Sequence, residues 1–437
     1  MTSAAPRPAD PDHLWSVDEH LEDILTTVHP LEPIELQLLD AQGCVLVEDV
    51  TVPVALPPFD NSSMDGYAVR VTDVAGASEE FPAVLEVVGD IAAGTADPVR
   101  VGPGQAARIM TGAPLPPGAE AVVPVEWTDG GLGEGPVTGM HARSLAPEGA
   151  AGHVRVHRSV EPRAHVRARG SDVRAGDRAL EAGTVLGPSQ IGLLAAIGRG
   201  TVRVRPRPRV VVMSTGSELV QPDEPLGGGQ IYDSNSFALT AAARDAGAIA
   251  YRVGAVADDA VTLRSTIEDQ LIRADLLVTT GGVSVGAYDV VKEALSDVGE
   301  AGGGVEFRKL AMQPGKPQGF GSVGPDHTPL LALPGNPVSS YVSFELFVRP
   351  AIRALMGLAD VHRPRIRATL TADAPLSSPK GRRQFLRGIY ADGEVTPVGG
   401  AGSHLIAALA HADALIVVPE DVESLEPGTE VETVLLR

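Results

Sequence analysis

The sequence predicts a multi-domain α/β plus β protein with a central doubly wound parallel sheet, and three observations support this fold class. The chain has 437 residues, 43% of them hydrophobic, which is too long for a single ordinary core. Between residues 206 and 360, buried strands alternate with helices, as in a parallel sheet that carries helices on both faces. Short strands separated by glycine and proline fill residues 57–166 and 361–437, which predicts two further β domains.

The first β domain is expected to be an insertion into a framework domain. From Val17 the pattern VDEHLEDILTTV predicts an amphipathic helix, and IELQLLDAQGCVLVEDV predicts a short helix that runs into a strand. Helical character returns in TVLGPSQIGLLAAIG, before the strand TVRVRP. We therefore assign residues 14–56 and 167–205 to a discontinuous framework domain of helical and mixed character, and residues 57–166 to the inserted β domain.

The α/β domain is expected at residues 206–360, and its elements follow one another in a regular order. PRVVVMSTG, AIAYRVGAVAD and ADLLVTTGG predict strands, and each precedes a predicted helix: DSNSFALTAAARDAG, DAVTLRSTIEDQLI and DVVKEALSDVG. PLLALPGNP predicts one more buried strand before the long helix PVSSYVSFELFVRPAIRALMG. Strands such as RIRATLTAD and ALIVVPED then predict a C-terminal domain over residues 361–437 that is like a small β-barrel.

Composition and charge exclude several classes of function. The formal net charge of −21 and the pI near 4.9 oppose nucleic-acid binding, because most of the surface would repel a polyanion. Cys44 is the only cysteine, so the chain can form no internal disulfide and no thiol-rich zinc site. The first residues lack the apolar core of a secretory signal, and no apolar run is long enough to span a membrane. We therefore expect a cytoplasmic protein without a nucleic-acid or membrane partner.

Three glycine-rich turns follow predicted strands of the α/β domain. They read STGSEL at 214–219, TTGGVSVG at 279–286 and LPGNPVSS at 333–340. Ligands of an open parallel sheet bind beyond the carboxyl ends of its strands, where glycine lets backbone N–H groups approach an anion closely. One such turn alone is more often an ordinary strand-to-helix connection, but three together predict a phosphate cradle. The expected substrate-binding residues are Ser214, Thr215, Gly216, Gly281, Gly282, Ser284, Gly286, Pro334, Gly335, Asn336 and Ser339.

Carboxylates accompany these turns. Glu218 lies in the first turn, Asp258 and Asp259 precede a predicted helix, and Asp289 follows the second turn. Because carboxylates repel a phosphate unless a cation stands between them, we expect Mg²⁺, with Glu218, Asp258 and Asp289 as its ligands. An aspartate before a helix can equally be its N-cap, so the metal role of Asp258 and Asp259 stays open. Neither the P-loop pattern nor the dinucleotide glycine pattern occurs at these turns, which disfavours both of those nucleotide-binding classes.

Several longer motifs, in order along nearly the whole chain, resemble a known family. They are FDNSSMDGYAV at 59–69, RIMTGAPLPPGAEAVVPVE at 108–126, RARGSDVRAGD at 167–177, MQPGKPQGFG at 312–321 and the three turns above. These motifs are similar to those of molybdopterin molybdenumtransferase, the MoeA family, whose relatives include the E domains of gephyrin and of plant Cnx1. The resemblance implies an enzyme of molybdenum cofactor biosynthesis. It would take adenylylated molybdopterin and molybdate as substrates, cleave the adenylate with Mg²⁺, and release AMP and the molybdenum cofactor.

The resemblance also implies roles for individual residues. The residues that match catalytic positions of the family are Asp65, Thr111, Asp172, Glu218, Asp289 and Lys316. Those that match molybdate positions are Lys316, Ser339, Arg387 and Ser403, and cations with hydroxyl donors suit a tetrahedral dianion. Some relatives carry a second lysine where this chain has Gln313, so Lys316 is expected to supply the local positive charge.

Partners and alternatives follow from the same resemblance. It implies a homodimer in which the inserted β domain of one subunit faces the α/β domain of the other, and it allows contact with molybdopterin adenylyltransferase. That adenylyltransferase is itself an alternative function, although its loop usually reads GGTG where residues 281–284 read GGVS. A non-catalytic scaffold of the gephyrin type is a second alternative, and a protein that binds molybdate or nucleotide without turnover is a third.

Overall fold

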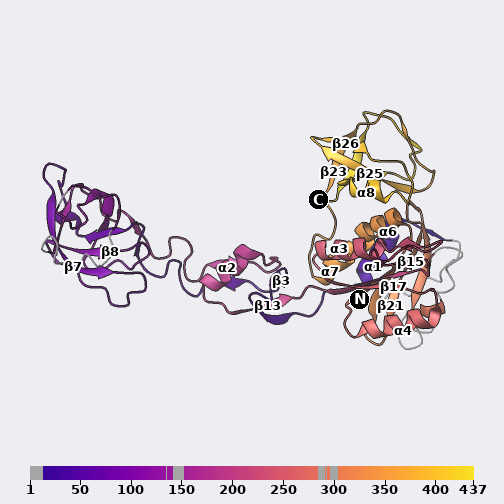
Figure 1. Cartoon of the computed structure of the whole chain (residues 1–437), viewed down its shortest axis with the longest axis horizontal. Helices are drawn as coiled ribbons and strands as arrows, with labels where there is room; N and C mark the ends of the chain where they lie inside the picture. The colour runs from indigo at the N-terminus through magenta and orange to yellow at the C-terminus, as the bar shows by residue number, and fades with distance from the viewer. Residues whose placement is uncertain (1–12, 134, 141–151, 284–290, 292, 296–303) are drawn as a thin grey trace. The chain divides into compact units, whose positions relative to one another are not determined.

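The structure of the chain is a computed structural model that describes residues 13–133, 135–140, 152–283, 291, 293–295 and 304–437 (Figure 1). The chain divides into two compact units. Unit 1 comprises Met1–Leu36, Gly43–Val47 and Arg203–Arg437, and unit 2 comprises Gln37–Gln42 and Glu48–Val202. Unit 1 holds the α/β sheet and the C-terminal barrel, whereas unit 2 is built mainly of β-strands. The four domain ranges expected from the sequence stay predictions.

A seven-stranded sheet forms the centre of unit 1. Its strands, in spatial order, are β1 (Leu14–Trp15), β19 (Val305–Leu310), β21 (Pro317–Val323), β22 (Thr328–Leu333), β18 (Leu276–Thr280), β14 (Arg209–Thr215) and β17 (Ile249–Val256). The four strands from β22 to β17 run parallel, which confirms the predicted parallel sheet. Strand β21 is antiparallel to both of its neighbours, and the sequence analysis did not predict β19 or β21 as strands.

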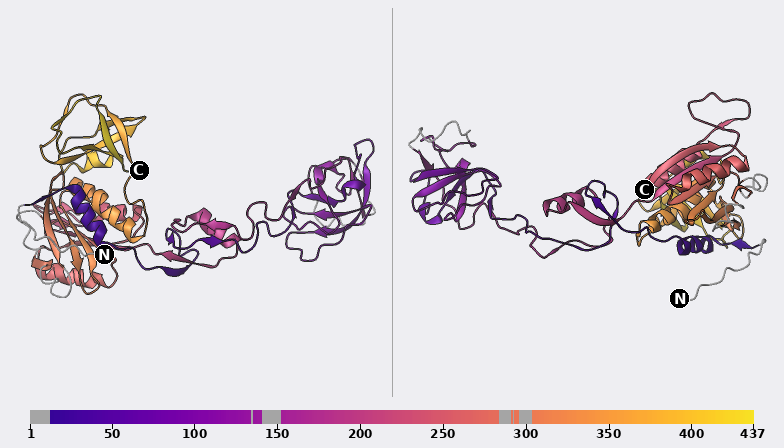
Figure 2. Two further views of the ribbon diagram at one scale, coloured as in Figure 1. Left: turned by 180° about the vertical axis from the view of Figure 1, so that it is seen from behind. Right: turned by 90° about the horizontal axis from the view of Figure 1, so that it is seen from below.

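Helices cover both faces of this sheet, as the doubly wound prediction requires (Figures 1 and 2). One face carries α3 (Asn235–Asp245), α6 (Pro337–Ser343), the π-helical turn η6 (Phe344–Val348) and α7 (Arg349–Leu355). The other face carries α4 (Ala260–Leu271). Strand β14 shows why two layers form: Val210 and Val212 face the first group of helices, and Val211 and Met213 face α4.

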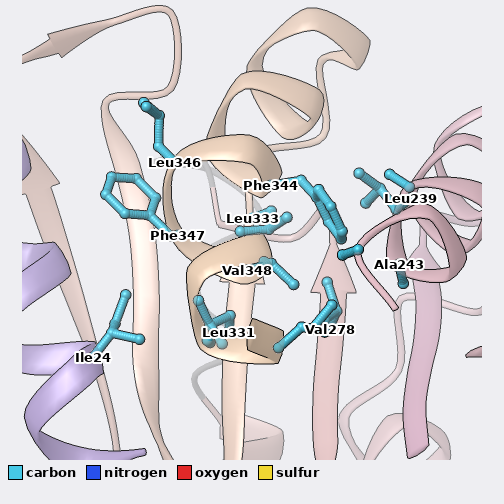
Figure 3. Packing of buried hydrophobic residues seen from close by; sticks show 14 of the residues in the cluster. Ile24, Leu239, Ala243, Val278, Leu331, Leu333, Phe344, Leu346, Phe347 and Val348 are labelled. Atoms are coloured by element: carbon cyan, nitrogen blue, oxygen red, sulfur yellow. The ribbon is translucent and has the colours of Figure 1, made fainter. Parts of the chain in front are cut away.

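The larger core lies between the sheet and the α6–α7 region (Figure 3). Phe344 and Phe347 are fully buried and pack near Leu331 and Leu333 of β22 and Val278 of β18. Burying an aromatic or aliphatic side chain of this size stabilises the fold by about 1.5–3 kcal/mol. This core therefore fixes the strand ends from which the glycine-rich turns emerge.

Helix α1 (Val17–Thr27) also belongs to this core. Ser16 and Glu19 form a capping box, since Glu19 N–H donates to Ser16 Oγ at 3.1 Å and Ser16 N–H donates to Glu19 Oε2 at 2.7 Å. The buried side chains Val17 and Ile24 pack with the cluster around Phe347, and α1 contacts α7 and η6. Helix α1, which lies within the predicted framework range 14–56, thus packs on the α/β core.

A closed barrel follows the α/β domain within unit 1. Strands β25, β26, β23, β29 and β27 pair in that order, and β27 pairs with β25 to close the ring, which confirms the predicted β-barrel-like domain. Strand β20 pairs with β25 and so connects the barrel to the segment after β19. The elements of this region are β20 (Met312–Gln313), β23 (Arg365–Leu370), β24 (Leu376–Ser377), β25 (Arg383–Ala391), β26 (Glu394–Pro397), α8 (Ile406–Ala410), β27 (Ala414–Val418), β28 (Ser424–Leu425) and β29 (Glu430–Leu435).

A five-stranded sheet in the order β10-β7-β8-β6-β9 forms the main core of unit 2. Its strands are β6 (Gly66–Val69), β7 (Ala83–Ile91), β8 (Gln105–Ile109), β9 (Ala121–Pro124) and β10 (His153–Val156). The other elements before the α/β sheet are β2 (Ile34–Gln37), β3 (Val45–Leu46), β4 (Val50–Thr51), β5 (Asn61–Ser62), η1 (Val71–Asp73), η2 (Val125–Trp127), β11 (Val166–Arg167), β12 (Arg178–Leu180), α2 (Pro188–Ala196) and β13 (Thr201–Arg205). In the described part of the chain, no helix combines the length and apolar character that crossing a membrane requires.

Candidate functional site

A cavity of about 980 Å³ opens at the carboxyl ends of β14, β18 and β22 in unit 1. This is the edge where ligands of open α/β sheets bind, and the volume suits a large ligand. All three glycine-rich turns contribute to its wall. The predicted substrate-binding residues that line it are Ser214, Thr215, Gly216, Gly281, Gly282, Pro334, Gly335, Asn336 and Ser339. Ser284 and Gly286, which were predicted with them, lie outside the described residues.

Close backbone approach explains the glycines of these turns. A Cβ atom on Gly281 would lie 2.4 Å from the carbonyl oxygen of Thr215, nearer than real Cβ contacts come, and the backbone there has φ +97°. A Cβ atom on Gly335 would lie 3.3 Å from Gly281 Cα. The first turn therefore touches the second, and the second touches the third, at positions where a side chain would push them apart.

Two polar side chains join the second and third turns. Thr280 Oγ1 donates a hydrogen bond to the carbonyl oxygen of Pro334 at 3.0 Å. Asn235, at the start of α3, donates from Nδ2 to Thr280 Oγ1 at 3.1 Å and to the carbonyl oxygen of Gly335 at 2.7 Å. Asn235 was not predicted from the sequence, because its amide stands at the start of a predicted helix, where ordinary capping already explains it.

A buried carboxylate anchors the same helix to the first turn. Asp233 is 1% exposed and accepts hydrogen bonds from Ser214 Oγ at 2.8 Å, from the Ser236 N–H at 3.0 Å and from Ser236 Oγ. Arg252 lies 3.6 Å from it. The single hydroxyl hydrogen of Ser214 is thus used on a protein partner and is not left to donate to an anionic ligand. Asp233 was also not selected from the sequence.

Two of the predicted metal ligands lie together at the cavity. Glu218 and Asp258 both line it and are exposed, and their turns are joined by the Ser217 N–H, which donates to Asp258 Oδ2 at 3.3 Å. The described residues give neither carboxylate an ion-pair partner. Mg²⁺ commonly binds through one or two carboxylates together with water and phosphate oxygens, so this donor set fits the ion. Asp289 lies outside the described residues, and within the described part of the chain no three His, Cys, Asp or Glu side chains form a closed metal cage.

Asp259 behaves differently from its neighbour. It is the N-cap of α4, and its Oδ2 accepts hydrogen bonds from the Thr262 N–H at 2.8 Å and from Thr262 Oγ1. The Thr262 hydroxyl and N–H hold the pKa of Asp259 below its usual value. The carboxylate of Asp259 therefore caps helix α4, whereas Asp258 lines the cavity.

Two cationic residues are connected to segments that line the cavity. Gln313, Pro314, Gly315 and Pro317 line the cavity, and Lys316 lies within this turn without being one of the lining residues. Its ammonium has no ion-pair partner among the described residues. An unpaired lysine in a chain of net charge −21 is suited to hold an anion.

Arg387 is a second unpaired cation and comes from β25. It is 2% exposed, and its guanidinium donates to the carbonyl oxygens of Gly402, at 3.2 Å, and Gly400. Its Nε has no acceptor among the described residues. Burial lowers the pKa of Arg387, because a charge in an apolar setting is destabilised. The neighbouring Ser403 lines the cavity and its carbonyl oxygen accepts from the Val338 N–H at 3.0 Å, so the loop held by Arg387 forms part of the wall.

Comparisons with known proteins agree along the chain. Residues 15–198 match the MoeA N-terminal region (domain I and II), residues 211–354 match a probable molybdopterin binding domain, and residues 369–436 match the MoeA C-terminal region (domain IV). Molybdopterin molybdenumtransferase 2 of Mycobacterium tuberculosis is 46% identical over 95% of this chain and 98% of its own length. The chain belongs to the molybdopterin molybdenumtransferase (MoeA) family. It is an enzyme of molybdenum cofactor biosynthesis, which confirms the family predicted from the motifs.

Two further relatives support the assignment of this MoeA-family chain. Molybdopterin molybdenumtransferase 1 of Mycobacterium tuberculosis is 41% identical over 96% of this chain and 99% of its own length. The crystal structure of a molybdopterin biosynthesis MoeA protein from Pyrococcus horikosii matches with a TM-score of 0.73 and 31% identity. That match covers 97% of this chain and all of that one. The multi-domain fold predicted from the sequence is therefore the fold of a solved relative.

The remaining catalytic residues expected from the MoeA motifs lie in unit 2. Asp65 Oδ1 accepts hydrogen bonds from the Thr111 N–H at 2.7 Å and from Thr111 Oγ1 at 2.8 Å, so the structure brings these two residues together from separate segments, before β6 and after β8. Asp172 is exposed in a separate loop, where its N–H donates to the carbonyl oxygen of Leu56. Their roles in catalysis stay predictions. His404, which lines the cavity of unit 1, was not selected from the sequence, because nothing in a lone loop histidine marks it as a cavity residue.

Proposed function

We propose that this MoeA-family enzyme inserts molybdenum from molybdate into adenylylated molybdopterin, with Mg²⁺-dependent release of AMP. The observation that carries the proposal is the cavity of about 980 Å³, where three touching turns meet two exposed carboxylates and where a further lining turn contains the unpaired Lys316. A single small anion would not need this space. A pterin and an adenylate joined through phosphate groups would use it.

Different groups at the cavity suit different parts of such a substrate. Backbone N–H groups of the turns would bind the phosphates, and Glu218 with Asp258 would hold Mg²⁺. When bound, Mg²⁺ would offset the negative charge of the phosphate oxygens. Lys316, Ser339, Arg387 and Ser403 would bind molybdate, because ammonium, guanidinium and hydroxyl groups donate hydrogen bonds to a tetrahedral dianion.

The decisive experiment supplies the purified protein with adenylylated molybdopterin, Mg²⁺ and molybdate and measures AMP. We expect AMP release that depends on both molybdate and Mg²⁺ and exceeds a protein-free control. A parallel incubation with molybdopterin and ATP tests the adenylyltransferase alternative, which would instead consume ATP. Absence of molybdate-dependent AMP release would reject the proposal and favour a scaffold or a binding protein without turnover.

The assembly and location belong to the same proposal. We propose a homodimer in which the inserted β domain of one subunit faces the α/β domain of the other, because most closed oligomers are twofold dimers and the MoeA resemblance implies one. Contact with molybdopterin adenylyltransferase would deliver the adenylylated substrate. A cytoplasmic location is proposed from the sequence alone.

A further inference from the structure

The first residue of helix α3 connects two turns of the cavity through its side chain. An amide NH₂ group has two N–H donors, and Asn235 uses them on Thr280 Oγ1, at 3.1 Å, and on the carbonyl oxygen of Gly335, at 2.7 Å. Thr280 passes the connection on, since its hydroxyl donates to the carbonyl oxygen of Pro334 at 3.0 Å. Two successive carbonyls of the third turn are therefore held by one short chain of hydrogen bonds.

Fixing these carbonyls also fixes the N–H groups that follow them. A trans peptide is planar, so its N–H points opposite to its C=O. The bond to Pro334 therefore orients the N–H of Gly335, and the bond to Gly335 orients the N–H of Asn336. Both residues line the cavity, and no described residue accepts a hydrogen bond from either N–H. These two donors are left for a ligand, while the carbonyls that would repel an anion are turned toward Asn235 and Thr280.

Asn235 is itself held in place. The adjacent Asp233, 1% exposed, accepts from Ser214 Oγ of the first turn and from the Ser236 N–H of α3. The start of α3 is thus anchored to the end of β14. Gly281 and Gly335 allow close contact between the turns, because a Cβ atom on Gly335 would already lie 3.3 Å from Gly281 Cα. Glycine has no side chain, so neither residue sets the spacing of the turns.

We infer that Asn235 is a positioning residue that sets the orientation of the third turn, and thereby the two N–H donors of Gly335 and Asn336, toward the substrate's phosphate groups. This inference deepens the proposed function and rests on it. Asn235 acts through Thr280 and the Gly335 carbonyl and not through contact with the reacting atoms. Its loss is expected to weaken binding of the adenylylated substrate more than binding of molybdate, because three of the four residues expected to hold molybdate, Lys316, Arg387 and Ser403, lie outside the third turn, which contributes only Ser339.

The test compares Asn235→Ala with the parent by steady-state kinetics, thermal unfolding and AMP titration. Misplacing a binding group by about 1 Å costs on the order of a hundredfold, so we expect the KM for adenylylated molybdopterin to rise by about ten- to a hundredfold. The KM for molybdate and the thermal unfolding midpoint should stay close to those of the parent. AMP titration in the presence of Mg²⁺ should show a parallel loss of affinity. Gln230→Ala is the matched control, because it removes an amide that bonds the Gly227 N–H at 2.8 Å and does not line the cavity.

Thr280 supplies the second variant. Thr280→Val removes the hydroxyl that connects Asn235 to Pro334, whereas Thr280→Ser retains it and should keep the parent KM. If Asn235 acts through Thr280, the double variant Asn235→Ala/Thr280→Val should be less impaired than the product of the single effects. An active Asn235→Ala protein with the parent KM and AMP affinity, or one with only a lowered unfolding midpoint, would overturn the inference. Failure of the proposed function looks different, since the parent itself would then release no AMP.

Discussion

At the scale of single residues, two adjacent aspartates between β17 and α4 have different roles. Asp258 faces the cavity, whereas Asp259 accepts from the Thr262 N–H and hydroxyl as the N-cap of α4. The sequence could not separate them, because both stand immediately before a helix and carry the same carboxylate. Only the path of the backbone decides which side chain turns toward the helix and which toward the cavity.

A pair of charge-removing variants tests this division. Asparagine caps helices about as well as aspartate, but Mg²⁺ prefers anionic oxygen ligands. We expect Asp258→Asn to raise the Mg²⁺ concentration needed for half-maximal AMP release by about tenfold or more, which corresponds to roughly 1.4 kcal/mol. Asp259→Asn, its matched control, should keep both the Mg²⁺ dependence and the unfolding midpoint. Equal effects of the two substitutions on Mg²⁺ dependence would remove Asp258 from the metal site.

Lys316 allows a similar test of the molybdate side. Its ammonium has no ion-pair partner among the described residues, and Gln313 in the same turn is neutral. A charge-assisted hydrogen bond is worth roughly 1.5–3 kcal/mol, so Lys316→Ala should raise the KM for molybdate by about ten- to a hundredfold. The KM for adenylylated molybdopterin should change less. Lys309→Ala removes the same charge from an exposed position outside the cavity and should change neither constant, and a parent-like molybdate KM in Lys316→Ala would show that the lysine is structural.

At the scale of elements, sequence patterns predicted which residues form strands and helices better than they predicted which elements pair or pack together. The alternation of buried strands and helices predicted β14, β17, β18 and β22, because each carries a run of apolar residues bounded by turn signals. Strand β21 was not predicted, because its sequence PQGFGSV contains glycines that weaken the strand pattern. Its hydrogen-bonded pairing with β22 stabilises the extended conformation that these residues favour only weakly. The amphipathic face of α1 was visible, but nothing in the helix itself shows that Phe347 covers it.

Helix α1 also carries a buried histidine that should make the fold sensitive to acid. His20 is 1% exposed, lies edge-on to Phe347 and Phe320, and faces Arg308, which pairs with Asp23. Burial, with a smaller contribution from Arg308, lowers the pKa of His20 from 6.5 to about 3. Below pH 6.5, His20 therefore binds a proton in the unfolded chain but not in the folded chain. The free energy of unfolding falls as the pH drops from 6.5 toward 3.

The size of this effect can be measured by replacing His20 with a residue that does not titrate. Between pH 7 and pH 5 a histidine of this kind costs about 2 kcal/mol of unfolding free energy. His20→Leu keeps an apolar side chain against Phe320 and Phe347 and cannot bind a proton. Denaturant unfolding of the parent should therefore lose about 2 kcal/mol more than His20→Leu over this pH range. Identical losses would mean that His20 is protonated in the folded state.

At the scale of the whole molecule, the motifs carried more of the function than the composition did. Net charge and the single cysteine excluded classes of function, but the order of long motifs predicted the MoeA family. The α/β centre and the barrel were predicted from the alternation of strands with helices and from the short C-terminal strands. The cavity was predictable because three glycine-rich turns follow strands of one parallel sheet. Asn235, Asp233 and His404 were not, because their importance arises only when α3 and the 399–404 loop come together around those turns.

The placement of the expected catalytic residues in two units leads to a test of the proposed dimer. Asp65 and Thr111 lie in unit 2, whereas Glu218 lies in unit 1. In the proposed dimer, each active site combines unit 2 of one subunit with unit 1 of the other. A mixed dimer of Asp65→Ala and Glu218→Ala subunits then contains one site with both residues intact and one site with neither.

Co-expression of these two inactive variants should therefore restore activity. With random pairing, half of the dimers are mixed and each has one intact site of two, so AMP release should reach about a quarter of the parent rate. Co-expression of Asp65→Ala with Thr111→Ala is the control, because both changes lie in unit 2 and every site then carries a defect in that unit. If each site were built from a single chain, both mixtures would stay at the level of the separate variants. Recovery in the first mixture alone would require that two subunits share each active site.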